Sequence, residues 1–167
     1  MVEDTRNPHA VKVLSIAKKF VDEAYAEEGD NLTIMGKWYG LNGQPWCAMY
    51  ISYCFNEVGL VNLVAAQSKK GFASCNSGWQ WFVKNKQSVA VGQAQPGDIV
   101  FFNFDDDPHT TEHVGIVYQN DGKNLICFEG NTSPEKSTGS QANGGGAYKR
   151  KRPYGFVMGV ARPKWPA

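Results

Sequence analysis

The spacing of apolar residues changes once along this chain, and that change limits the folds open to it. Before the Pro96-Gly97 turn, apolar residues recur every three or four positions, as on one face of a helix. After the turn they alternate and are rich in β-branched and aromatic side chains. Helices followed by antiparallel strands predict an α+β fold with the helices on one face of the sheet. The 167 residues suit one domain over 1–167.

Local signals predict the individual elements. The first helix begins at Pro8 and ends near Gly29, and a glycine-rich loop over 36–44 follows it. The second helix begins at Pro45, because a first helical position needs no backbone N–H, and it ends at Gly59. The remaining predictions are short helices over 61–67 and 77–86, a hairpin turn at 121–122, a polar loop over 133–146, and strands over 98–104, 113–118, 125–128, 147–150 and 156–162.

Composition argues against several functional classes. A formal net charge of +1 gives no reason to expect nucleic acid as a partner. No apolar run approaches the ~20 residues that a membrane-spanning helix needs, so we expect no membrane insertion. The first residues, Met1–Arg6, are polar and acidic and do not resemble a Sec signal peptide. We expect a monomer.

One of the four cysteines differs from the others in its placement. No C-x-x-C pair is present, and Cys54, Cys75 and Cys127 are expected to be buried apolar side chains. Cys47 falls in the first turn of the second predicted helix, where free N–H groups and the helix dipole favour a thiolate. A thiolate attacks amide carbonyls, and the same N–H groups could hold the resulting oxyanion. From placement alone, a structural role beside Trp46 is equally open.

A histidine and two possible partners lie on neighbouring predicted strands. His113 begins one strand and shares a face with Gly115, which suggests that this face meets a helix or a cleft. Glu129 and Asn131 share one face of the strand expected to pair with it. Either could accept a hydrogen bond from His113 Nδ1–H, which would leave Nε2 facing Cys47.

Five segments, in order, resemble the motifs of the CHAP family, the cysteine, histidine-dependent amidohydrolases/peptidases. They are 45–52 (PWCAMYIS), 96–102 (PGDIVFF), 113–117 (HVGIV), 129–131 (EGN) and 160–163 (VARP). The resemblance spans about residues 8–163, which it makes the core of a single CHAP-like domain. It implies a compact papain-like fold and cleavage of amide bonds in bacterial peptidoglycan. It makes Cys47 the nucleophile and His113 the general base and acid. It also implies that Glu129 orients the imidazole and that Asn131 assists beside it.

The resemblance also suggests a biological setting. Such domains occur in phage endolysins and bacterial wall hydrolases, and the start of this chain suits an endolysin made in the host cytoplasm that reaches the wall through a holin. The bond cut is either that between muramic acid and L-alanine (amidase) or one within the peptide (endopeptidase). No separate wall-binding domain is expected. Calcium-binding members carry a run of Asp before the nucleophile; here residues 40–46 read GLNGQPW, so we predict no metal and no cofactor.

Two other functions stay open from the residues. The loop over 105–113 contains Asp105–Asp107 and His109, which together with His113 could serve a metal-dependent hydrolase. Two histidines four residues apart share a face only in a helix, however, and Pro108 disfavours one. The second alternative is a non-catalytic wall-binding module that keeps the fold, although neither the thiol nor the base is missing.

Several side chains could line the site without taking part in the chemistry. Gln44 could donate to the oxyanion, although a hydrogen bond within its loop is an equally open role. Trp46, Trp38 and Tyr39 could line a substrate groove or pack in the core. The basic run over 149–152 is typical of a solvated strand edge that blocks unwanted pairing.

Overall fold

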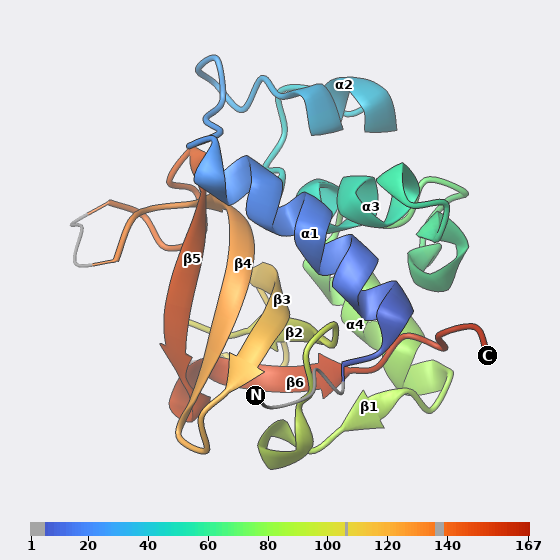
Figure 1. Cartoon of the computed structure of the whole chain (residues 1–167). Helices are drawn as coiled ribbons and strands as arrows, with labels where there is room; N and C mark the ends of the chain where they lie inside the picture. The colour runs from blue at the N-terminus through green and yellow to red at the C-terminus, as the bar shows by residue number, and fades with distance from the viewer. Residues whose placement is uncertain (1–5, 106, 136–138) are drawn as a thin grey trace.

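Helices occupy the first half of the chain and strands the second (Figure 1). The computed structural model describes residues 6–105, 107–135 and 139–167, so residues 1–5 of the predicted polar start and Asp106 of the acidic loop lie outside the described part. The α-helices are α1 (Pro8–Asp22), α2 (Ile34–Tyr39), α3 (Cys47–Glu57) and α4 (Cys75–Lys84). The strands are β1 (Ser88–Val89), β2 (Ile99–Phe102), β3 (His113–Asn120), β4 (Asn124–Thr132), β5 (Gly146–Pro153) and β6 (Val157–Ala161).

The strands form one antiparallel sheet in the order β1-β6-β2-β3-β4-β5. The helices α1 and α3 lie over one face of it (Figure 1), where their side chains form the main core with Val114, Ile116 and Phe128. This arrangement confirms the predicted α+β fold with N-terminal helices packed on a C-terminal sheet. Among the described residues, no helix combines the length and apolar character required to cross a membrane.

The opposite face of the sheet carries the side chains that alternate with this core. Val100, Phe102, Val117 and Cys127 form a second, smaller cluster there. His113 and Gly115 belong to the same face by strand alternation. Of the two predictions for this face, a helix or a cleft, the structure does not bear out the helix, because α1 and α3 cover the other face. His113 is the first residue of β3, and this end position lets its ring reach Cys47 at the start of α3.

The first helix is shorter than predicted because its end is fixed by backbone geometry. Ala24 has a φ of 53°, and the N–H groups of Ala24 and Tyr25 donate to the carbonyls of Val21 and Phe20 at 3.1 and 2.9 Å. This is a Schellman end, and it stops α1 at Asp22.

A second difference is α2, which begins before the stretch 36–44 predicted to be a glycine-rich loop and overlaps its first four residues. Thr33 caps its start by accepting from Gly36 N–H, and Gly40 ends it with a φ of 99°. The helix α3 begins at Cys47, two residues after Pro45, so Cys47 is still in the first turn. The strand β4 extends beyond the predicted 125–128 and includes Glu129. The short strand β1 was not predicted.

Candidate active site

The helix α3 begins at Cys47, and no side chain caps its first N–H groups. Trp46 is the N-cap residue, and its side chain makes no capping hydrogen bond. The other three α-helices of the described part are capped by side chains, those of Asn7, Thr33 and Ser74. An uncapped helix start is able to bind an anion through its N–H groups. One of them, that of Ala48, already hydrogen-bonds to the Cys47 sulfur.

His113 connects the Cys47 thiol to a buried carboxylate. His113 Nε2 lies 2.8 Å from Glu129 Oε1, and both side chains are completely buried. Nδ1 has no hydrogen-bond partner among the other described residues and is the nitrogen that is left to interact with the Cys47 thiol. The predicted orientation of the ring is therefore wrong: Nε2 faces the acid, and Nδ1 is the nitrogen left for the thiol. The chemistry is unchanged, because either nitrogen can hold the proton.

The electrostatics favour a thiolate beside an imidazolium. A hydrogen bond from Cys75 and the interaction with His113 hold the pKa of Cys47 well below its usual value, although burial opposes them. Burial lowers the pKa of His113, but hydrogen bonds with Cys47 and Glu129 outweigh it and raise that pKa to about 9. Burial raises the pKa of Glu129, but hydrogen bonds from His113 and Arg152 bring it below its usual value. The charges on Cys47, His113, Glu129 and Arg152 therefore alternate in sign.

Two glycines allow the strands to bring these groups together. A Cβ on Gly115 would lie 2.8 Å from Glu129 Cγ, so the absence of a side chain on β3 makes room for the carboxylate. A Cβ on Gly130 would lie 2.7 Å from Tyr50 Cβ, so this glycine lets β4 approach α3. Contacts this short between real Cβ atoms would force the backbone apart.

Arg152 is a residue of the site that sequence analysis missed. Its Nε lies 2.9 Å from Glu129 Oε2 and 3.2 Å from Oε1, and its side chain is 4% exposed. The pairing of β4 with β5 sets Leu125 opposite Arg152, which places the arginine on the same sheet face as Glu129. Lys149 and Lys151 are exposed while both arginines are buried, so the prediction of a solvated edge is correct only for the lysines.

Aromatic rings fill the space between His113 and Arg152. The His113 ring centroid lies 5.8 Å from both Phe102 and Phe104, at interplanar angles of 27° and 34°. The guanidinium of Arg152 lies over the same two rings, 5.3 and 4.8 Å from their centroids. The stack adds cation–π attraction and limits rotation of the histidine ring.

Asn131 lies close in sequence to Glu129 but bonds elsewhere. Its Nδ2 donates to Asn143 Oδ1 at 3.1 Å, and its Oδ1 accepts from Gly145 N–H at 3.1 Å. Its backbone has a φ of 56°, in the left-handed region that asparagine tolerates. The structure thus brings together Cys47, His113 and Glu129, whereas the hydrogen bonds of Asn131 hold the loop before β5.

The four other predicted lining residues differ in exposure. Trp46 is completely buried and donates through Nε1 to Glu27 Oε2 at 2.9 Å, so it packs in the core and cannot line a groove. Gln44 is exposed, three residues before the nucleophile. Trp38 and Tyr39 are half-buried.

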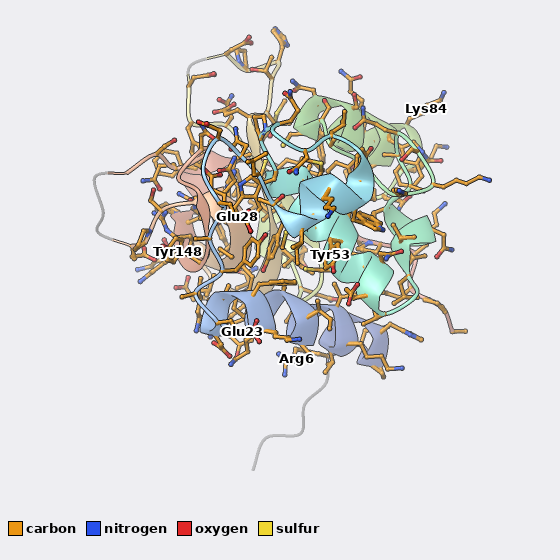
Figure 2. All side chains as sticks on the ribbon, turned by 90° about the horizontal axis from the view of Figure 1, so that it is seen from above. Arg6, Glu23, Glu28, Tyr53, Lys84 and Tyr148 are labelled. Atoms are coloured by element: carbon orange, nitrogen blue, oxygen red, sulfur yellow. The ribbon has the colours of Figure 1, made fainter. Side chains whose placement is uncertain are left out.

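Trp38 packs on α3 through Tyr53, and Tyr39 packs against Trp38 and the main core. The Trp38 and Tyr53 ring centroids are 5.5 Å apart, and Tyr53 lies 5.9 Å from Phe20 of α1. Figure 2 shows Tyr53 between α1 and α2. Packing of α2 on the core is therefore the role that the structure supports for these rings.

All four cysteines are free and buried, as predicted for three of them. Cys75 departs from that prediction in one respect, because its Sγ lies 3.6 Å from Cys47 Sγ. Its hydrogen bond to Cys47, together with burial, raises the pKa of the Cys75 thiol well above its usual value. Cys75 therefore carries the proton that stabilises the neighbouring thiolate.

The acidic loop does not assemble a metal site in the described part of the chain. No group of three or more His, Cys, Asp or Glu side chains there could hold a metal ion. Asp105 and Asp107 are exposed and accept hydrogen bonds from backbone N–H groups of their own loop. His113 faces Glu129 instead of His109, which removes the pair on which a metal-dependent mechanism would depend.

Three comparisons show which known proteins this chain is similar to. Residues 38–131, more than half of the chain, match the CHAP domain model. The "Probable endopeptidase p60" of Listeria grayi is 34% identical over 102 residues, which are 61% of this chain and 16% of that protein. An NLP/P60-family lipoprotein-like structure from Staphylococcus aureus covers 98% of this chain and 44% of its own, with a TM-score of 0.46 and 14% identity.

The family match has clear limits along the sequence. It includes Cys47, His113, Glu129 and Asn131 but ends before β5, so it does not reach Arg152. The similar p60 protein is much longer than the part that this chain spans. The extent of the CHAP match and the site residues within it lead to one conclusion: this chain belongs to the CHAP domain family.

Proposed function

We propose that this protein is a cysteine-dependent peptidoglycan hydrolase that cleaves an amide bond of the wall peptide. The observation that carries the proposal is the Cys47–His113–Glu129 set at an uncapped helix start. Family membership and the likeness to a p60 endopeptidase support the substrate class. Its origin in a phage, its action at the wall after synthesis in the host cytoplasm, and its monomeric state stay predictions.

The first half of the reaction forms a thioester. The Cys47 thiolate attacks the amide carbonyl carbon, and the free N–H groups at the start of α3 stabilise the oxyanion, with Gln44 as a second donor from the preceding loop. The His113 imidazolium then gives its Nδ1 proton to the leaving nitrogen, and the C–N bond breaks. Nε2–H stays hydrogen-bonded to Glu129, which fixes the ring during transfer.

The second half restores the enzyme. Neutral His113 takes a proton from water at Nδ1, and the resulting hydroxide attacks the thioester carbonyl. The second tetrahedral intermediate collapses, releases the carboxylic acid and leaves the Cys47 thiolate beside a His113 imidazolium. Glu129 is required twice, because His113 must be positively charged at the start and at the end of each cycle.

The raised pKa of His113 predicts a difference between two pH profiles. Hydrolysis needs protonated His113, so its rate should fall as the pH rises through about 9. Alkylation of Cys47 needs only the thiolate and should not fall there, because the thiolate persists at high pH. Both rates would be measured on one preparation from about pH 7 to about pH 10. A parallel fall of the two rates would contradict the acid role of His113.

Arg152 has a positioning role in this scheme. Its guanidinium neutralises Glu129 and fixes both carboxylate oxygens, so the carboxylate stays ionised in a completely buried place. Without it, burial would favour protonation of Glu129, and His113 would lose the charge that stabilises its imidazolium. The Cys47 thiolate would then lose the positive charge that stabilises it, and the pKa of Cys47 would rise.

We expect Arg152→Gln to move the pH profile of Cys47 alkylation to higher pH and to lower the hydrolysis rate. Arg152→Lys should restore part of the shift, because it keeps the charge without the fork of donors. Arg150→Gln is the matched control: Arg150 is also buried and shares Gln141 Oε1 with Arg152, but none of its hydrogen bonds in the described structure reaches Glu129. Equal profiles for the Arg152→Gln and Arg150→Gln variants would leave Arg152 with a structural role only.

The bond that is cleaved can be identified from the products. Purified peptidoglycans with different cross-bridges would be digested, and the new amino termini identified by mass spectrometry. A free L-alanine amino group indicates the amidase, and a free amino group within the stem or bridge indicates the endopeptidase. If the wild-type protein produces no new amino terminus in any wall, the proposed function is wrong.

A further inference from the structure

The nucleophile has a second sulfur beside it that the proposed hydrolysis does not require as a reactant. Cys47 Sγ and Cys75 Sγ are 3.6 Å apart, and no disulfide joins them. Each is the first residue of its helix, so the positive ends of two helix dipoles, those of α3 and α4, meet at the two sulfurs. Ser74 caps α4, and Asn76 Oδ1 accepts from Thr111 N–H at 2.8 Å, which fixes Cys75 against the segment before β3.

We propose that Cys47 and Cys75 are an oxidative modification site, at which a hydroperoxide converts the two thiols into a reversible disulfide. A disulfide bond is about 2.05 Å long, so the two sulfurs must approach by about 1.5 Å to form one. The residues are 4% and 8% exposed, so the pair is shielded from large thiols but within reach of a small oxidant.

The first step oxidises the nucleophile. The Cys47 thiolate attacks one oxygen of the peroxide, an S–O bond forms and the O–O bond breaks, which gives Cys47 sulfenic acid and hydroxide. The hydroxide takes the Nδ1 proton of His113 and leaves as water. Sulfur loses two electrons in this step, and the peroxide oxygens gain them.

The second step closes the disulfide. Cys75 sulfur attacks Cys47 sulfur, an S–S bond forms and the S–O bond breaks. The departing hydroxide takes up the proton of Cys75 and leaves as water. Neutral His113 relays this proton from Cys75 to the hydroxide. The sum is two thiols and one peroxide converted to one disulfide and two waters, so no further reactant is needed.

The other two cysteines explain why the modification should be selective. Cys54 and Cys127 are buried, and burial is the main cause that raises the pKa of each thiol. No described sulfur lies within hydrogen-bonding distance of either. They are therefore neither reactive thiolates nor able to form a disulfide, and they serve as internal controls.

The proposal is tested by mapping the thiols of the oxidised protein. The protein would be treated with a small molar excess of hydrogen peroxide, denatured in iodoacetamide and digested without reduction. Trypsin leaves Cys47 and Cys54 on one peptide, so chymotrypsin, which cuts after Tyr50, is added to separate them. We expect a Cys47–Cys75 cross-linked peptide, lighter by two hydrogens than its two parts, with Cys54 and Cys127 alkylated. Dithiothreitol should restore alkylation of Cys47 in the folded protein.

The variant Cys75→Ser separates this proposal from general oxidation of a reactive thiol. Without the second sulfur, Cys47 should proceed to sulfinic acid, which dithiothreitol cannot reverse. Two results in the wild-type protein would overturn the proposal. One is Cys47 sulfinic acid while Cys75 remains a thiol that iodoacetamide alkylates, and the other is a disulfide between two chains. The mapping does not depend on hydrolysis: a cross-link in a protein that cleaves no wall would refute only the proposed function.

Discussion

Cys47→Ser should abolish hydrolysis of peptidoglycan while leaving the folded structure intact. The hydroxyl of serine remains protonated where the thiol of cysteine ionises, so His113 would face a weak nucleophile. Removal of a nucleophile from such a set lowers the rate by roughly 10⁴-fold or more. The measurement is the release of new amino termini from purified wall, with circular dichroism as the check on folding.

A second cysteine of α3 supplies the control. Cys54 lies two turns further along the same helix, is 1% exposed and packs in the main core. Cys54→Ala should lower the free energy of unfolding by about 1 kcal/mol or somewhat more but keep the activity of the folded protein. If Cys47→Ser retains more than a small part of the wild-type rate, Cys47 is not the nucleophile.

The parts of the site that sequence predicted are those fixed by local geometry. Cys47 was predicted from its place in a first helical turn, and His113 and Glu129 from strand alternation and one hairpin. These relations depend on the chain within a few residues, so periodicity shows them. The same logic placed the helices before the sheet and predicted the antiparallel pairing of β3 with β4.

The parts that sequence missed depend on contacts between distant segments. The alternating Lys-Arg-Lys-Arg run of β5 looks like an exposed edge until the register sets Leu125 opposite Arg152 and the loop before β5 covers the arginines. Cys75 has no sequence signal that relates it to Cys47, because two separate helices bring them together. Which nitrogen of His113 faces the acid depends on where the fold places Glu129 and Cys47 around the ring, and no local pattern encodes that placement.

Glu129 and Asn131 were both candidates to orient His113. From the structure we expect substitutions of the two residues to lower the hydrolysis rate by different amounts. Glu129→Gln removes the charge that stabilises the imidazolium, so the hydrolysis rate should fall by up to roughly 10⁴-fold. Asn131→Gly removes the amide but tolerates the backbone φ of 56°, so it should cost less. Both rates would be compared with the pH profile of Cys47 alkylation. Only Glu129→Gln should move that profile to higher pH.

Burial of Glu129 adds a complication that the experiment must separate from catalysis. In Glu129→Gln the guanidinium of Arg152 loses its buried partner, and an unpaired buried charge costs about 3–5 kcal/mol of stability. The double variant Glu129→Gln/Arg152→Gln removes both charges and should recover much of that stability. If activity returns with stability, Glu129 serves the fold alone. If the double variant folds and stays inactive, Glu129 orients and charges His113. A different outcome would make the triad Cys47–His113–Asn131. In that outcome Asn131→Gly lowers the hydrolysis rate more than Glu129→Gln does, and Glu129→Gln leaves the pH profile of Cys47 alkylation unchanged.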